Sequence, residues 1–272
     1  MNYQFCNFSV REKEALGNIF NVSFKMNTDG YNELFAAYDD FQSYYYNNEP
    51  KKGRSRYQLM AREAFLPQTK DEKFSVKYKD SVQYQIGIDL PVLINPAENV
   101  THKGTIFFVA EDPLRPPPTE VEKNKFNRKN DIVLSTPFGV HLEKECREKR
   151  LKVYWQVFEK LLDDGYSIYA TDIYKIWMKQ IGSRSKEKIP NDLIEAFKNS
   201  LQEEVNWLTP SLVVCYGNRA FDAANHLSLK TENILFPHPS GSANGKWKRD
   251  MGKADDQFKK DYIYSKIKKT IN

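Results

Sequence analysis

Short apolar runs alternate with helical patterns over the second part of the chain, from about residue 96. Apolar runs of strand length predict buried strands, and longer stretches with apolar residues three and four positions apart predict amphipathic helices. The predicted strands are GTIFFVA (104–110), YSIYAT (166–171), SLVVCYG (211–217) and NILFPH (233–238). The predicted helices between them cover residues 141–165, 190–208 and 218–227.

This alternation predicts a three-layer α/β/α domain over residues 96–272. Parallel strands that are joined by helices need right-handed crossovers, and these cover both faces of the sheet. Gly165 is typical of a helix end, and Pro190 with Asn191 is typical of a helix start. We therefore expect a central parallel sheet of about four strands.

Residues 1–95 differ from the rest because they are rich in tyrosine and asparagine and lack strong apolar strands. In YNELFAAYDDFQSYYY the apolar and aromatic residues recur at helical spacing, which predicts an amphipathic helix over about 31–46. We expect this part to be a mainly helical N-terminal extension, to which the sequence assigns no role.

The composition is that of a folded protein with a mild positive charge. The 272 residues are 40% hydrophobic and 14% aromatic, and 41 Lys and Arg against 36 Asp and Glu give a net charge of +5. This charge is compatible with a polyanionic partner without requiring one. No stretch reaches the roughly 18 apolar residues of a membrane span, and no apolar leader begins the chain, so we expect a cytoplasmic protein without membrane contact.

The three cysteines, Cys6, Cys146 and Cys215, lie far apart in the sequence. Their odd number argues against a disulfide framework, and three cysteines cannot form a four-cysteine metal or iron–sulfur site. We expect a reducing compartment and no cofactor.

Polar motifs follow each predicted strand: EDP, TD, GNRA and HPSGSAN, in that order. In parallel sheets ligands bind at the carboxyl ends of the strands, so we expect these residues to converge on one edge.

Five motifs, VAEDPLR, STPFG, IYATDIYK, LVVCYGNRA and FPHPSGSAN, stand in the order and at the approximate spacing of the uracil-DNA glycosylase superfamily. The chain resembles this superfamily over about residues 96–250. Its first strand ends in a short acidic or Gln-Asp-Pro-Tyr type motif, its second in Asn and its fourth in His-Pro-Ser. One such motif alone is weak support, whereas five in order are strong support.

The resemblance implies roles for four residues. Asp112 stands at the carboxylate position that orients the attacking water and stabilises the sugar cation, and His238 stands where a donor meets O2 of the base. Glu111 competes with Asp112, because the iron–sulfur branch carries Glu there; we favour Asp112 because the Asp-Pro pair matches the other branch. Phe138 resembles the aromatic residue that stacks on the extruded base.

Two departures concern the identity of the base. Asp172 stands where the family usually has Asn; an ionised Asp only accepts hydrogen bonds, so it suits the N4 amino group of cytosine and would repel uracil O4. Leu114 replaces the Tyr that crowds the 5-position of uracil, which leaves room for a 5-substituent. Together they favour a modified cytosine, such as the bulky 5-substituted bases of some bacteriophages.

The segment after His-Pro-Ser departs from the apolar wedge of the family. Trp247 either enters or flanks the DNA groove or packs inside the protein. Backbone phosphates are the expected partners of the polar residues Ser240, Ser242 and Asn244, and the basic residues Lys246, Lys248 and Arg249 are expected to enter or flank the groove.

Simpler interpretations stay open for each of these residues. Asp-Pro pairs often start turns, a lone histidine in a loop is often structural, and Phe138 fits an ordinary core position. Asp172 fits a helix cap or a salt bridge equally well.

We therefore expect a metal-independent, monofunctional DNA glycosylase that acts on DNA as a monomer and leaves an abasic site, with a modified cytosine of foreign DNA as the base. Two alternatives remain: a uracil-DNA glycosylase of base-excision repair, and a catalytically inactive relative that only binds nucleic acid.

Overall fold

The computed structural model describes residues 3–47, 58–80, 82–111, 131–139, 152–183 and 185–271, with only the backbone described for 40–47, 58–61 and 131. Two of the predicted site residues, Asp112 and Leu114, lie outside the described residues.

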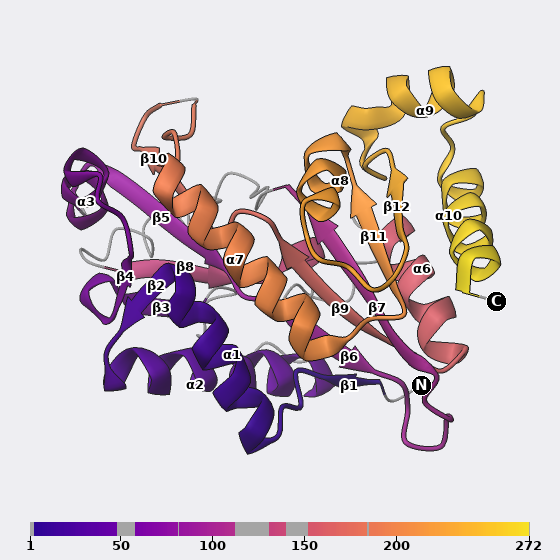
Figure 1. Ribbon diagram of the computed structural model, residues 1–272, viewed down its shortest axis with the longest axis horizontal. Coiled ribbons are helices and arrows are strands. Elements are labelled where there is room, and N and C mark those ends of the chain that lie inside the picture. Colours follow the sequence, from indigo (N-terminus) through magenta and orange to yellow (C-terminus); the bar gives the residue numbers. More distant parts are fainter. Residues whose placement is uncertain are drawn as a thin grey trace.

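A six-stranded sheet lies at the centre of the molecule, with the strand order β1-β6-β9-β7-β11-β12 (Figure 1). In chain order its members are β1 (Gln4–Phe5), β6 (Val92–Asn95), β7 (Gly104–Ala110), β9 (Tyr166–Asp172), β11 (Leu212–Tyr216) and β12 (Asn233–Phe236).

Four neighbouring strands of this sheet, β9, β7, β11 and β12, run parallel. These are the four strands that the sequence predicts, and the prediction is confirmed. On one side the sheet continues with β6, antiparallel to β9, and with β1, antiparallel to β6, so the complete sheet is mixed. All residues of β9 and β11 are buried, which explains why these strands are continuous apolar runs rather than alternating patterns.

Helices flank the central sheet (Figure 1). The helices of the described residues are α1 (Val10–Ser23), α2 (Thr28–Asn47), α3 (Glu72–Lys79), α6 (Lys152–Asp163), α7 (Asn191–Leu208), α8 (Asn218–Asn225), α9 (Asn244–Met251) and α10 (Asp256–Ile271). Within the described ranges, no helix has the length and apolar character that crossing a membrane requires.

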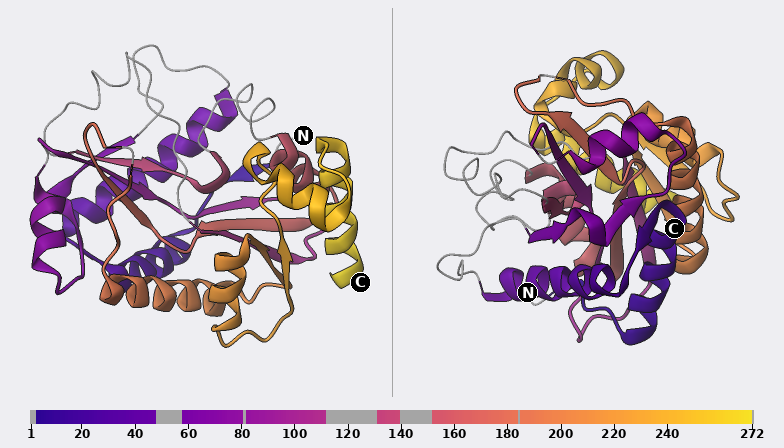
Figure 2. Two further views of the ribbon diagram at one scale, coloured as in Figure 1. Left: turned by 90° about the horizontal axis from the view of Figure 1, so that it is seen from above. Right: turned by 90° about the vertical axis from the view of Figure 1, so that its left-hand side faces the viewer.

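Successive side chains of a strand point to opposite faces of the sheet and contact different helices. Phe107 of β7 stacks on Tyr169 of β9 at 5.1 Å, and Trp207 of α7 contacts Tyr169 at 6.0 Å between ring centroids. Phe108, the next residue of β7, contacts Phe158 of α6 at 4.8 Å. Helix α7 therefore covers one face and α6 the other, which confirms the predicted three-layer architecture. Seen from above, α7 stays on one side of the sheet (Figure 2).

The predicted helices coincide with observed ones. Helix α2 contains the predicted helix 31–46, α7 matches 190–208, and the described part of 141–165 is α6. Gly165 follows the end of α6 with a φ of +96°, and a Cβ at this position would lie 2.2 Å from the carbonyl oxygen of Thr101. Only glycine fits there, so the predicted end of this helix has a steric cause.

Residues before 96 share sheets and helix contacts with later residues. Besides β1 and β6 in the central sheet, α1 packs against α7, where Ser23 Oγ lies 2.6 Å from Ser200 Oγ. The predicted boundary at residue 95 thus falls inside a continuous structure. The sequence pattern misses this because β1 has two residues and its partner β6 has four.

A second sheet joins the N-terminal part to the turn that follows β9. Its strand order is β10-β5-β8-β3, and β5 and β8 run parallel. Two further short strands, β2 and β4, pair with each other. In chain order these strands are β2 (Phe24–Met26), β3 (Gln58–Ala61), β4 (Phe65–Pro67), β5 (Tyr84–Asp89), β8 (Asp131–Ser135) and β10 (Ile176–Gln180).

Candidate functional site

The carboxyl ends of the four parallel strands meet at one edge of the central sheet (Figure 1). Ala110 at the end of β7 pairs with Asp172 at the end of β9, and Tyr216 at the end of β11 pairs with Phe236 at the end of β12. Glu111 and His238 lie immediately beyond these ends. The polar motifs of the sequence are therefore on the same edge, as expected for parallel strands.

His238 is half-buried, and its ring takes part in a chain of hydrogen bonds with the hydroxyl groups of three residues. Tyr154 Oη lies 2.7 Å from Nδ1 and 2.8 Å from Nε2 of the imidazole. On the other side Ser240 Oγ lies 2.9 Å from Nδ1, and Ser242 Oγ lies 2.8 Å from Ser240 Oγ.

The backbone of this loop bears on the protonation of His238. The amide of Ser240 contacts Nδ1 at 3.3 Å, and a backbone N–H can only donate a hydrogen bond. This contact favours an unprotonated Nδ1, with the proton of the neutral imidazole on Nε2. Nε2–H then has Tyr154 Oη as its acceptor.

Tyr154 of α6 is the centre of an aromatic cluster at this edge. Its ring centroid lies 4.9 Å from Phe138, 5.3 Å from Tyr216 and 5.4 Å from His238. Burial raises the pKa of the Tyr154 phenol well above its usual value of 10.0, and Tyr216 and Asp172 raise it further. The hydroxyl therefore stays protonated at neutral pH and bonds to the imidazole as a neutral group.

Sequence reasoning misses Tyr154, because a tyrosine on the apolar side of an amphipathic helix is normally a packing residue. Its neighbours Val153 and Trp155 are buried as well. A buried tyrosine hydroxyl needs a hydrogen-bond partner, and this requirement is the only hint that the sequence carries.

Phe138, the predicted stacking residue, lies in this cluster. It is half-buried, and its ring is 5.7 Å from Tyr216 and 5.8 Å from Phe158. Its backbone is left-handed, with φ +52° and ψ +19°, which is unfavourable for a residue with a Cβ and occurs preferentially at functional sites. The structure thus brings Phe138 and His238 together on Tyr154.

Asp172 is the last residue of β9 and is 3% exposed. The preceding residue, Thr171, contacts Glu204 of α7, and successive strand residues point to opposite faces, so the Asp172 side chain points to the face of the aromatic cluster. Its negative charge contributes to the raised pKa of Tyr154. A carboxylate in such a place is costly to bury, and it persists where a specific donor meets it. Asp172 therefore lies at the same edge as the aromatic cluster, and its contact with a base stays a prediction.

Glu111 pairs with an arginine and not with a residue of the aromatic cluster. Its carboxylate forms an ion pair with Arg219 of α8, and both side chains are more than a third exposed. Glu111 is thus engaged at the surface, while Asp112, the other candidate for the catalytic carboxylate, lies outside the described residues.

Trp247 is a packing residue, and the interpretation as a groove contact is wrong. Its side chain is fully buried, it packs against Phe258 and Tyr262, and its Nε1–H donates to the carbonyl oxygen of His238 at 3.0 Å. The buried indole therefore stabilises the loop that carries His238 through this hydrogen bond.

The polar and basic residues predicted to contact DNA lie in the loop after His238 and on α9: Ser240 and Ser242 precede the helix, and Asn244, Lys246 and Arg249 belong to it. Asn244 Oδ1 accepts from Lys259 Nζ at 2.6 Å, and Lys246 Nζ donates to Asn218 Oδ1 at 2.7 Å. Ser242 and Arg249 are exposed, with Arg249 Nε 2.9 Å from Asp250 Oδ1. Asn244 thus has its partner inside the fold, Ser240 and Lys246 are half-buried, and Ser242 and Arg249 lie at the surface.

A buried ion pair lies on the opposite face of β9. Lys175 Nζ is 2.7 Å from Glu204 Oε1 of α7, both side chains are at most 2% exposed, and Thr171 Oγ1 bonds to both groups. Burial raises the pKa of Glu204 above its usual 4.5, against the lowering effect of the Lys175 cation. The carbonyl oxygen of Lys175 accepts from the amide of Asp89 at 3.0 Å, so the turn after β9 is tied to the second sheet.

The two described cysteines, Cys6 and Cys215, are free and buried. Burial raises the pKa of each thiol to about 12, so neither supplies a thiolate at neutral pH. Within the described ranges no three His, Cys, Asp or Glu side chains gather in a way that could hold a metal ion.

Comparison of the sequence with protein-family models and with curated proteins found no match in either case.

Proposed function

We propose that the protein is a monofunctional DNA glycosylase, which flips a base out of DNA, hydrolyses its N-glycosidic bond and leaves an abasic site. The observation that carries this proposal is the convergence of Phe138 and His238 on Tyr154, at the carboxyl edge of the parallel strands. An aromatic ring beside a hydrogen-bond donor is what a flipped-out base requires of a protein.

His238 is the donor in this proposal. When the N-glycosidic bond breaks, the electron pair of the bond goes to the base, and negative charge develops on its carbonyl oxygen O2. A donor fixed at this position stabilises the charge as it forms. His238 supplies this donor from a ring whose orientation Tyr154 and Ser240 set at the carboxyl edge of the sheet.

Phe138 supplies the stacking surface. The base loses its stacking neighbours when it leaves the duplex, and an aromatic ring replaces them regardless of the identity of the base. The ring of Phe138 is held in place by Tyr154, Tyr216 and Phe158, so it is fixed before the base arrives.

Asp112 is the carboxylate that we assign to the sugar. A carboxylate beside the anomeric carbon stabilises the sugar cation and orients the water that adds to it. The contact between Glu111 and Arg219 supports this choice, because the competing carboxylate is already engaged in an ion pair at the surface.

Asp172 sets the base preference in our proposal. Its carboxylate accepts from the N4 amino group of cytosine, whereas it repels O4 of uracil. Because unmodified cytosine is abundant in every genome, a second criterion is needed, and Leu114 supplies room for a substituent at the 5-position. We therefore propose a modified cytosine of foreign DNA as the target base and DNA as the partner.

A substrate panel tests this function. Purified protein is incubated with plain DNA, uracil-containing DNA in single and double strands, and DNA with bulky 5-substituted cytosines, and abasic sites are then cleaved with alkali. We expect strand breaks at the modified cytosines alone. Breaks at uracil alone would overturn the proposed base and support uracil repair, and no breaks on any substrate would overturn the glycosylase function.

A further inference from the structure

A buried lysine lies beneath the loop that follows His238. Lys259 belongs to α10, and its side chain is only 1% exposed. Its Nζ donates to the carbonyl oxygen of Pro239 at 3.1 Å and to Asn244 Oδ1 at 2.6 Å, and Asp256 Oδ1 is 3.9 Å away. The ammonium thus joins the C-terminal helix to the His-Pro-Ser loop and to the first residue of α9.

Packing alone does not account for a lysine at this position. Burial of an ammonium group is costly, and an apolar side chain of similar length, such as Met, would fill the same space without this cost. An ammonium has three donors, and two of them go to the two segments that flank the loop. The charged group is therefore used to hold these segments together.

A second buried side chain, that of Trp247, donates to the carbonyl group that precedes the one bound by Lys259. Trp247 Nε1–H donates to the carbonyl oxygen of His238 at 3.0 Å, and Lys259 donates to the next carbonyl oxygen, that of Pro239. Two consecutive carbonyl groups thus receive donors from helices α9 and α10. The backbone at His238 is consequently fixed, and the hydroxyl groups of Tyr154 and Ser240 then orient the ring.

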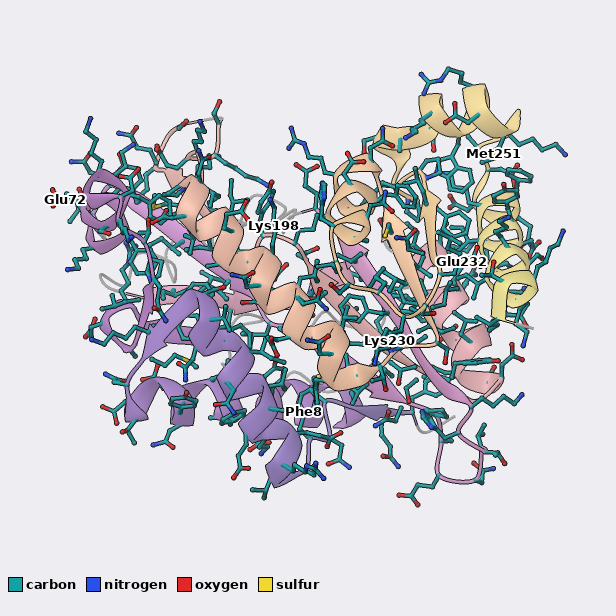
Figure 3. All side chains as sticks on the ribbon, viewed as in Figure 1. Phe8, Glu72, Lys198, Lys230, Glu232 and Met251 are labelled. Carbon is teal, nitrogen blue, oxygen red and sulfur yellow. The ribbon has the colours of Figure 1, made fainter. Side chains whose placement is uncertain are left out.

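Figure 3 places Met251 at the end of α9, where the chain turns back toward α10. The short connection between the two helices brings Lys259 back under the loop from which α9 starts. Helices α9 and α10 therefore both contact the His-Pro-Ser loop.

We propose that Lys259 is a positioning residue for His238: its ammonium fixes the backbone that carries the imidazole. The inference rests on the proposed function, in which His238 must donate to the base. Among the described residues, the titratable groups around His238 are Tyr154 and Tyr216, which contact its ring, Asp172 beyond Tyr154, and Lys259 below the loop with Asp256 beside it.

Replacement of Lys259 by Met tests this role, with Lys268→Met as the matched control. Lys268 lies on the same helix and pairs with Asp164 at 3.1 Å, away from the loop. The pKa of His238 and the position of its proton are measured by NMR titration, with a His238→Gln variant to assign the signals. We expect Lys259→Met to change the His238 pKa and the position of its proton, because the ring loses its fixed contacts with Tyr154 and Ser240, and to lower the rate of base excision about tenfold through lost orientation.

The two readouts separate this inference from the proposed function. If the wild-type protein excises no base, the NMR titration still tests the positioning role. A folded Lys259→Met variant whose His238 pKa and proton position equal those of wild type and of Lys268→Met would overturn it.

If Lys259→Met does not fold, the wild-type protein supplies the test. With ¹⁵N-labelled lysine we expect ammonium signals protected from solvent exchange from the two buried lysines, Lys175 and Lys259, and one of them should disappear in Lys259→Arg. A spectrum in which Lys259→Arg removes no protected ammonium signal would contradict the inference.

Discussion

Tyr154 Oη lies within hydrogen-bond distance of both ring nitrogens of His238, at 2.7 Å and 2.8 Å. The contact joins helix α6 to the loop after β12, two segments that are 84 residues apart in the sequence. Because the phenol is buried and stays protonated, it orients the imidazole without adding a charge. Within the proposed function, Tyr154 thus sets the orientation of the imidazole from which His238 donates its proton.

Tyr154→Phe should therefore impair base excision more than folding. Loss of one hydrogen bond costs about 1 kcal/mol of stability, and loss of ring orientation should lower the single-turnover excision rate about tenfold. Tyr264→Phe is the matched control, since Tyr264 donates to Asp164 at 2.8 Å in a part-buried contact away from the site. Equal excision rates for the two variants would refute the role of Tyr154.

Asp172→Asn should change the base preference. An Asn amide can both donate and accept, so it can meet O4 and N3–H of uracil, whereas the carboxylate of Asp172 suits an amino donor. We expect excision of the cytosine-type base to fall at least about tenfold and excision of uracil to rise. Rates are compared on matched oligonucleotides, and an unchanged ratio of the two activities would rule out contact between Asp172 and the base.

Trp247→Phe should destabilise the protein without weakening its affinity for DNA. The substitution removes the hydrogen bond to the His238 carbonyl and leaves a cavity in a fully buried site, which together cost about 2 to 3 kcal/mol. Denaturant unfolding and a DNA titration at fixed salt measure the two effects. A large loss of affinity at unchanged stability would instead indicate that the indole contacts DNA.

Replacing one partner of the ion pair between Lys175 and Glu204 should destabilise the protein more than replacing both partners. Lys175→Met leaves a buried carboxylate without its cation, at about 3 to 5 kcal/mol, whereas Lys175→Met with Glu204→Leu should recover most of this loss. Because burial raises the pKa of Glu204, its protonated form stabilises the fold below its ordinary pKa of 4.5, and this stability is lost as the pH rises through the raised value.

The deficit of Lys175→Met should therefore grow between about pH 5 and about pH 8, because loss of the cation raises the pKa of Glu204 further. Urea unfolding at both pH values measures it. The double variant serves as the control, since it lacks the carboxyl group and should show a smaller change with pH. A deficit that is independent of pH would show that Glu204 is not the group responsible.

The parallel part of the fold was predictable from the sequence, because its strands are continuous apolar runs separated by amphipathic helices. The remaining strands were not. Strand β10 begins only three residues after β9 ends, so its apolar positions resemble part of a turn. Strands β1 and β6 are short, and their pairing depends on contacts between distant segments, which a local pattern does not contain.

The candidate site was predictable where it follows strand ends. His238 and Asp172 lie at the expected edge because motifs after parallel strands must meet there. Phe138 follows β8 of the second sheet, and only the resemblance to a known superfamily pointed to it. Tyr154 and Lys259 were not predictable, since a tyrosine or a lysine in an amphipathic helix normally packs or faces solvent. Their roles arise from the loop that lies against them, and only the tertiary structure shows that loop.

The most direct test of the account compares wild-type protein with Asp112→Asn on DNA that carries 5-substituted cytosine. Abasic sites are counted after alkali cleavage, and DNA affinity is measured on the same oligonucleotides. We predict that the wild-type protein forms abasic sites and that Asp112→Asn loses this activity at least about 100-fold, with affinity for DNA unchanged. If both proteins bind DNA equally well and neither forms abasic sites, the protein is a nucleic-acid-binding relative and the central claim is wrong.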